Sequence, residues 1–310
     1  MQPRWDSPQD MFGFFNYLEN RYKATELARA MVRMDPYNFE PNQFPRLDSQ
    51  WTRERILLVL MDEMNLARTE YYFSEFLSRM ELRRTIASPE NRDKRSEAEI
   101  ELDAGPGKYR FRVWVPENIL FVGTMNEDET TQALSDKVLD RANVMRFGMP
   151  DEKSQPTTGE IQLRDSADYI SFAHWHNWHR PVAQDTDTGS QVDKWLSEIN
   201  IALDSVGRPF GFRLRKAIHQ YVANYPNVDE GGRHQLAFAD QLEYKIMPRL
   251  RGLDMGDNSA PHCLNKVGDI ISHLEDRKLE KAFQRAKDDS GHLGLFQWRG
   301  VTRPVQEEED

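Results

Sequence analysis

Two short apolar runs stand out in the first half of the chain. Residues 55–61 (RILLVLM) and residues 118–124 (NILFVGT) are rich in Leu, Ile and Val, and polar residues follow each run. This length and composition predict strands buried on both faces, as in a parallel sheet. Residues 110–115 alternate between polar and apolar positions and predict another strand, and residues 143–147 predict a further strand.

Helical spacing separates these predicted strands. Residues 25–32 contain good helix formers with apolar side chains on one face, and Pro36 ends the pattern. Residues 70–84 repeat apolar side chains at helical intervals, and residues 135–141 predict a short helix. Strands that alternate with helices predict an α/β fold.

The second half of the chain changes character near Pro150. A polar, irregular segment is followed by four helical patterns over residues 191–206, 212–224, 234–251 and 262–287. We therefore expect a small all-helical domain after the α/β domain. The expected boundaries are an α/β core over 1–150, a linker over 151–190, a helical domain over 191–302 and an acidic tail over 303–310.

Composition narrows the class of protein. No apolar run approaches the roughly 20 residues that a membrane-spanning helix needs, and the first residues lack the apolar centre of a signal peptide. The formal net charge of −10 argues against a chain that grips nucleic acid by itself. The single cysteine, Cys263, excludes an internal disulfide and fits a reducing compartment. We therefore expect a cytoplasmic protein without membrane attachment.

The first run ends in two carboxylates, Asp62 and Glu63. The carboxyl ends of strands in an open α/β sheet are where ligands bind. There Asp62 could hold Mg²⁺ and Glu63 could polarise an attacking water, as nucleotide hydrolysis requires. The alternative is a solvated acidic end of a strand.

Three further polar positions follow in a suggestive order. Asn126 closes the second run and could orient the water or contact a terminal phosphate; otherwise it is a turn residue. Arg141 follows it and could project onto a neighbouring subunit's phosphate; otherwise it pairs with Asp136 or Asp140 on the surface. Arg213 and Arg215 open a predicted helix and could contact phosphate from a lid; otherwise they form a solvated basic face.

Together these segments resemble the AAA+ NTPase family and, within it, the McrB-type branch of GTP-dependent restriction motors. The resemblance covers roughly residues 5–252, and its most specific parts are LLVLMDEMNLARTEYYFSEFLSRME (57–81) and VPENILFVGTMNEDETTQALSDKVLDRANVMRF (115–147). It implies that Asp62 and Glu63 form the Walker B motif and that Asn126 is sensor 1. It also implies that Arg141 is an arginine finger and Arg213 sensor 2.

The resemblance also implies cofactors and partners. It implies hydrolysis of ATP or GTP with Mg²⁺ held by Asp62, a ring of subunits, hexameric in most of the family, and a nuclease subunit in defence against foreign DNA. Contact with DNA would be indirect. Residues 127–130 (EDET) depart from the Thr-Ala-Asp-Arg that often follows in McrB-type proteins, and this departure bears on GTP preference rather than on the AAA+ resemblance.

One family motif is missing from the sequence. No Gly-x-x-x-x-Gly-Lys-Ser/Thr occurs, so the chain has no loop of that kind to cradle the phosphates. We expect the fold to be a P-loop NTPase-type (AAA+) parallel sheet without its first strand, which would leave strand edges unpaired and apolar faces exposed. The chain then reads as a fragment that begins after Walker A. The alternative is a non-catalytic interaction subunit or remnant that pairs with a P-loop-bearing partner.

Two other patterns in the sequence could carry chemistry. His174, His176 and His179 lie close in sequence, which suggests either a zinc site with Cys263 as a distant ligand or an aromatic-rich linker. Residues 83–112 mix basic and acidic side chains, which is typical of a solvated insertion or of a hairpin at the pore of a ring.

Overall fold

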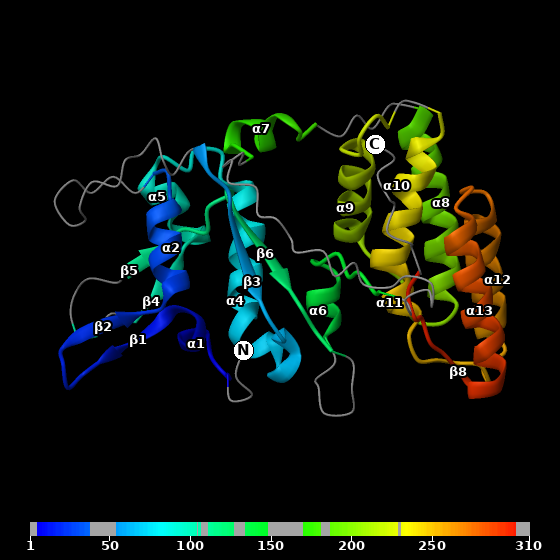
Figure 1. Ribbon diagram of the computed structural model, residues 1–310, viewed down its shortest axis with the longest axis horizontal. Coiled ribbons are helices and arrows are strands. Elements are labelled where there is room, and N and C mark those ends of the chain that lie inside the picture. Colours follow the sequence, from blue (N-terminus) through cyan, green and yellow to red (C-terminus); the bar gives the residue numbers. More distant parts are fainter. Residues whose placement is uncertain are drawn as a thin grey trace, which may run out of the picture. The chain divides into compact units, whose positions relative to one another are not determined.

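The computed structural model describes residues 5–37, 54–103, 105–106, 111–126, 134–147, 170–180, 187–228 and 231–301. The chain divides into two compact units (Figure 1). The α/β unit comprises Met1–Val138 with Asp165–Trp178, and the helical unit comprises Leu139–Arg164 with His179–Asp310. The division falls between Val138 and Leu139, earlier than the expected boundary at residue 150, so the segment that carries Arg141 belongs to the helical unit.

The α/β unit contains short helices and strands throughout. Its α-helices are α1 (Pro8–Phe12), α2 (Glu26–Met34), α4 (Thr69–Leu82), α5 (Arg92–Arg95), α6 (Asp136–Leu139, which crosses into the helical unit) and α7 (Phe172–Asn177). Its 3₁₀ turns are η1 (Met64–Leu66), η2 (Arg83–Thr85) and η3 (Ser96–Ala98). Its strands are β1 (Gly13–Asn16), β2 (Arg21–Ala24), β3 (Leu57–Met61), β4 (Ile100–Leu102), β5 (Phe111–Val113) and β6 (Ile119–Gly123).

The two apolar runs become β3 and β6, and these strands pair with each other in parallel. The register runs from Leu57 opposite Ile119 to Met61 opposite Gly123, so both strands end at the same edge. Helix α4 covers one face of the pair, where Phe121 lies 4.5 Å from Phe76 and 6.0 Å from Phe73 between ring centroids. The predicted helix over 70–84 and the two predicted strands are therefore confirmed.

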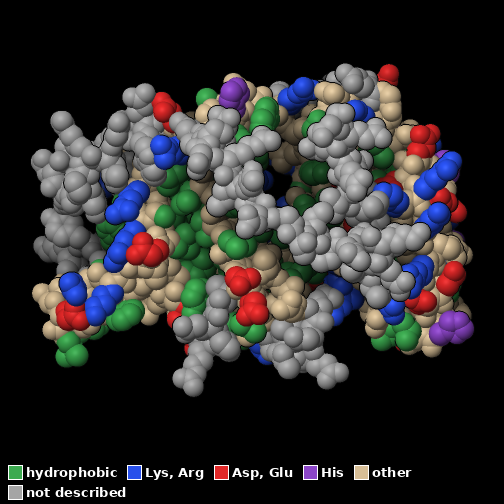
Figure 2. Space-filling view, viewed as in Figure 1, with side chains coloured by type: hydrophobic (Ala, Val, Ile, Leu, Met, Phe, Trp, Pro, Cys, Tyr) green, Lys and Arg blue, Asp and Glu red, His purple; other side chains and the backbone are tan. Residues whose placement is uncertain are grey.

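The other face of this strand pair is open. Leu58, Leu60 and Val122 are 60%, 62% and 44% exposed, although they alternate with buried or half-buried neighbours. Figure 2 shows hydrophobic side chains gathered on the surface over β3 and β6. The prediction that these strands are buried on both faces is wrong for the described residues: nothing in that part of the chain covers Leu58 and Leu60 as α4 covers Phe121.

The polar segment over 83–112 is built into the α/β unit. Strands β4 and β5 pair antiparallel, and Ile100, Leu102 and Val113 are buried. Arg95 is also buried, because it bonds to the carboxylates of Asp35 and Glu99. Most described charged side chains of this segment, such as Glu90 and Lys94, are exposed as a solvated insertion predicts, whereas Arg95 and Glu99 are buried. The strands β4 and β5 form an antiparallel pair, and a place for it at the pore of a ring stays a prediction.

The helical unit carries most of the long helices. Its elements are α8 (Asp187–Asp204), α9 (Phe212–Ala223), α10 (Arg233–Gln241), the π-helical turn η4 (Leu242–Ile246), α11 (Met247–Leu250), β7 (Leu253–Asp254), α12 (Ser259–Ser272), α13 (Arg277–Leu293) and β8 (Leu295–Phe296). Their apolar faces meet in one core, which includes the fully buried Leu196, Leu203, Phe238 and Leu264. The antiparallel pair of β7 and β8 corrects the expectation that this half is all-helical.

The pattern over 262–287 forms two helices rather than one. Glu275 adopts a left-handed backbone with φ 59°, which breaks the helix after α12. The carboxylate of Asp276 then accepts hydrogen bonds from the backbone N–H groups of Lys278 and Leu279 and caps α13. Apolar side chains continue at helical spacing across this break, which is why the sequence pattern alone suggested a single helix.

The predicted strand over 143–147 does not join the β3–β6 sheet in the described structure. Only Phe147 makes a bridge, and its partner is Val301 in the helical unit. Val144 is buried, and its N–H donates to the carbonyl of Tyr244. This segment therefore bonds to a helical turn through Val144 and to the last described residue through Phe147 rather than to a sheet. Across the described residues, no helix is both long and apolar enough to span a bilayer.

Candidate functional site

The acidic turn is formed where β3 ends. Asp62 and Glu63 follow Met61 directly, and both side chains are exposed. Glu63 has φ 51° and ψ 47°, a left-handed conformation that costs a non-glycine residue free energy. This conformation reverses the chain into η1 and presents two adjacent carboxylates at the edge of the strand pair. Such backbone strain is most frequent at functional sites.

Thr124 holds this turn from the neighbouring strand. Its hydroxyl donates to Oδ1 of Asp62 at 2.5 Å and accepts the N–H of Glu63 at 2.8 Å. Its backbone N–H donates to the carbonyl of Met61 at 3.0 Å, and its carbonyl accepts the N–H of Met64 at 2.9 Å. One residue after β6 therefore contacts the last residue of β3 and the three residues that follow it, and fixes the direction of the Asp62 carboxylate.

Asn65 links the same turn to Asn126. Its side-chain amide donates to the carbonyl oxygen of Asn126 at 2.7 Å, and Asn65 is only 2% exposed. Asn126 itself is exposed, just beyond the end of β6. The structure therefore brings together three of the predicted site residues, Asp62, Glu63 and Asn126, on two segments that hydrogen bonds hold side by side.

Sequence reasoning missed Thr124 and Asn65. Both lie inside the quoted runs, Thr124 two residues before Asn126 and Asn65 two residues after Glu63. The signal that could have found them is the parallel register, because pairing Met61 with Gly123 places the next residues of both strands opposite each other. A small hydroxyl residue directly after one strand can then bond to an acid directly after the other.

The donor atoms of this edge are hard oxygens, from the carboxylates of Asp62 and Glu63 and the hydroxyl of Thr124. Mg²⁺ commonly binds one or two carboxylates and takes its other ligands from water and substrate phosphates. The residues therefore fit a Mg²⁺ that arrives with a nucleotide. They do not form a closed metal cage, since the described part of the chain contains no group of three or more His, Cys, Asp or Glu residues placed to hold a metal.

Arg141 belongs to a different unit from this edge. It follows α6 by two residues, is half-buried and belongs to the helical unit. The alternative interpretation paired it with Asp136 or Asp140, and the carboxylate of Asp140 accepts a hydrogen bond from Arg249. The sequence therefore assigned Arg141 to the α/β domain, whereas the structure groups its segment with the helices.

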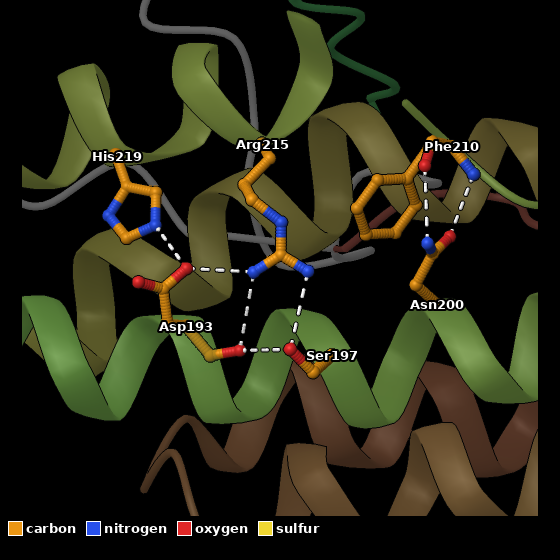
Figure 3. Close-up of polar contacts among 6 residues, drawn as sticks. All are labelled: Asp193, Ser197, Asn200, Phe210, Arg215 and His219. Carbon is orange, nitrogen blue, oxygen red and sulfur yellow. Dashed lines mark hydrogen bonds and ion pairs between the residues drawn. The ribbon is translucent and has the colours of Figure 1, made fainter. Parts of the chain in front are cut away.

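The two arginines of α9 have different surroundings. Arg213 is exposed in the first turn of the helix. Arg215 instead bonds to α8, donating to the carboxylate of Asp193 at 2.7 Å and to the hydroxyl of Ser197 at 3.3 Å (Figure 3). His219 contacts the same oxygen of Asp193 at 2.9 Å. The Asp193 carboxylate thus joins α8 to α9 through Arg215 and His219.

The other patterns yield no metal site in the described chain. His174 and His176 lie on α7 of the α/β unit, whereas His179 is grouped with the helical unit. Cys263 is fully buried in the helical core, and burial raises the pKa of its thiol to about 11. A buried, protonated thiol is a poor metal ligand, so Cys263 serves as a core residue.

Comparisons with known proteins concern the second half of the chain. A family model described as "Domain of unknown function (DUF8727)" matches residues 162–289, a span that includes α8 to α12 and lies outside the acidic turn. No curated protein matches the chain. No solved structure matches it either.

Proposed function

We propose that the α/β unit carries the acidic half of a nucleoside triphosphate hydrolysis site of the AAA+ kind. The observation that carries this proposal is the in-register parallel pairing of β3 with β6, which brings Asp62 and Glu63 beside Thr124 and Asn126. Asp62 would hold Mg²⁺ and Glu63 would polarise the attacking water. Asn126 would orient that water or contact the terminal phosphate.

The phosphate cradle must come from another polypeptide segment. The printed sequence has no Gly-x-x-x-x-Gly-Lys-Ser/Thr, so this chain supplies the acids but no Walker A loop. In the proposed assembly, subunits form a ring in which Arg141 of one subunit contacts the nucleotide of the next, and Arg213 contacts phosphate from the helical unit. By the sequence resemblance we extend the proposal to ATP or GTP as substrate and to a restriction complex with a nuclease subunit.

The decisive experiment supplies the missing loop. The chain is produced together with a polypeptide that carries a Walker A motif, chosen from the open reading frames beside its gene. We expect turnover of ATP or GTP with Mg²⁺ that neither part shows alone. Glu63→Gln should retain nucleotide binding and lose turnover, because an amide cannot polarise water as a carboxylate does. Glu90→Gln, an exposed carboxylate away from the turn, is the matched control and should keep full activity.

Subunit mixing tests the trans role of Arg141. Arg141→Ala should reduce turnover by about a thousandfold or more, the size typical of arginine fingers. A mixed ring of the Glu63→Gln and Arg141→Ala proteins contains interfaces with both groups intact, so its activity should exceed that of either protein. If exchange of subunits is demonstrated and activity does not recover, Arg141 does not act on a neighbour's nucleotide.

A second candidate function is supported by the open face of the strand pair. Leu58, Leu60 and Val122 expose an aliphatic surface that a parallel sheet normally covers on both sides. A non-catalytic subunit that binds a P-loop-bearing partner through this face would show the same surface. Complex formation with the P-loop-bearing polypeptide that survives Glu63→Gln, without turnover in the unmodified complex, would favour this function over hydrolysis.

A further inference from the structure

The segment that carries Arg141 is tied to the helical unit as a strap, which we define as residues 139–147. Val144 is 5% exposed, and its N–H donates to the carbonyl of Tyr244 at 3.3 Å. Pro248, four residues after Tyr244, has no N–H to donate to that carbonyl as a regular helix would require. The helix widens here into the π-helical turn Leu242–Ile246, a feature often found at functional sites.

Lys245 in this turn reaches the two peptides that flank Arg141. Its Nζ donates to the carbonyl oxygen of Asp140 at 3.2 Å and to that of Ala142 at 2.5 Å. Lys245 is only 5% exposed. A buried ammonium is costly unless hydrogen bonds compensate it, and the two carbonyls of the strap supply such bonds to Lys245. Lys245 is therefore stabilised in its buried position by the same hydrogen bonds that hold the strap against the helical turn.

Two further contacts hold the strap on either side of Arg141. On the N-terminal side, Arg249 of α11 donates to the carboxylate of Asp140. On the C-terminal side, Arg146 donates to the carbonyl of Trp298 at 3.1 Å. Gly300 allows this approach, because it has φ 85° and a Cβ there would lie 2.4 Å from the carbonyl oxygen of Arg146.

We infer that Lys245 is the positioning residue for Arg141: by binding the carbonyls of Asp140 and Ala142 it makes the arginine a rigid part of the helical unit. Any rotation of that unit then carries Arg141 with it, together with Arg213 on α9. Lys245 touches no nucleotide in this scheme and acts only through the strap. We call the two hydrogen bonds from Lys245 to the strap, together with the Arg249–Asp140 contact, the latch. The role of Arg141 on phosphate rests on the proposed function, whereas the latch is a property of this chain alone.

Hydrogen exchange on the full chain tests the latch. Lys245→Met removes the donor while keeping the length of the side chain, and we expect the amide of Val144 to exchange about tenfold faster or more, as loss of charged hydrogen bonds predicts. Exchange in α12 should not change. Lys266→Met, at an exposed lysine of α12, is the matched control and should leave the Val144 amide as it is. An unchanged Val144 amide in a folded Lys245→Met protein would overturn the inference.

A second variant covers the case in which Lys245→Met unfolds the helical unit. Asp140→Asn weakens the contact with Arg249 from the strap side, where the carboxylate side chain is 29% exposed. It should accelerate exchange of Val144 with α12 unchanged, and Arg249→Lys, which keeps a cation, should preserve most of the protection. Equal exchange of Val144 in the wild type and in Asp140→Asn would then contradict the latch.

Kinetics of the complex with the P-loop polypeptide separate positioning from mere structure. Lys245→Met should lower kcat with little change in KM, and in the Arg141→Ala background it should lower kcat no further. If Lys245→Met opens the strap and kcat stays unchanged, the positioning role is wrong. If no preparation hydrolyses nucleotide, the proposed function fails, and the exchange results alone decide whether the latch exists.

Discussion

The helical unit and the α/β unit differ in how much of their apolar residues is exposed to water. In the helical unit, leucines such as Leu196, Leu203 and Leu264 are fully buried in one core. In the α/β unit, the neighbouring leucines of β3 divide between the α4 face and an open face, where Leu58 and Leu60 are 60% and 62% exposed. Both of these leucines of β3 are exposed to water, whereas Leu196 and Leu203 of α8 are buried.

The difference lies in how far the described residues of each unit cover its apolar surface. Helices satisfy their own backbone hydrogen bonds and need only bury one stripe, which a bundle of helices accomplishes. A parallel sheet requires neighbours at both edges and cover on both faces. In the described α/β unit, α4 covers only one face of the β3–β6 sheet. The acidic turn therefore lies at the end of a sheet that has a free edge and an open face to which another strand and helix could bind.

The largest expected effect is in hydrogen exchange. Amides of β3 and β6 should exchange about a thousandfold faster than amides of α8 and α12, because local openings in a two-stranded pair require far less free energy than opening a closed core. Exchange of the full chain followed by mass spectrometry measures both in one sample. Equal protection of β6 and α12 would show that the α/β unit is as complete as the helical one.

Matched leucine substitutions sharpen the same contrast. Leu203→Ala should lower the free energy of unfolding of the helical unit by about 2–5 kcal/mol, because it leaves a cavity in a closed core. Leu60→Ala should change the free energy of unfolding by about 0.5 kcal/mol or less, since the side chain is already exposed to water. Urea titration of each variant checks both values. A large cost of Leu60→Ala would mean that this face is covered in solution.

Thr124 provides an effect of intermediate size. Thr124→Val removes the hydroxyl that joins Asp62 to Glu63 and should cost about 1 kcal/mol, the usual net value of a hydrogen bond. Thr124→Ser keeps the hydroxyl and serves as the control. Exchange of the amides of residues 62–66 reports the loosening of the turn. If valine and serine variants behave alike, the hydroxyl does not hold the acids.

The smallest expected effect is a pH dependence of opposite sign in the two units. Burial raises the pKa of Asp35 above its ordinary 3.8 and that of Glu99 above 4.5, although Arg95 lies between them. These acids bind protons more tightly when folded, so the stability that this pair contributes to the α/β unit should rise as the pH falls from neutral toward 4.5 and be lost as the pH rises through the raised pKa values. Asp35→Asn should reduce this slope.

In the helical unit the carboxylate of Asp193 shows the reverse. Burial acts to raise its pKa, but hydrogen bonds from His219 and Arg215 outweigh burial and hold the pKa below 3.8. The stability that this carboxylate contributes is present above pH 3.8 and is lost as the pH falls through the lowered pKa. Exchange rates of α8 and of β4 across the acid range compare the two units, and Asp193→Asn is the control. Parallel slopes in both units would contradict the assignment.

Much of the fold follows from local sequence. The strands at 57–61 and 119–123, the helix over 69–82 and the helices α8 and α9 were predictable, because apolar periodicity and element length are local properties. The polar residues that end β3 and β6 were predictable as a pair for the same reason. Bringing Asp62 and Asn126 together then required only that two buried strands be neighbours in parallel.

The sequence by itself determined where the elements lie and which acids end a strand. Only the tertiary structure decided that Thr124 and Asn65 hold those acids, that Leu60 is exposed, and that the strap with Arg141 belongs to the helices. An apolar strand pattern indicates that a face can be buried but does not indicate which element covers it. The residues at 143–147 are an example, because they bond to a helical turn rather than to a sheet. Partners distant in sequence, such as Lys245 and Asp140, leave no local signal, because their attraction exists only once the chain has brought them together.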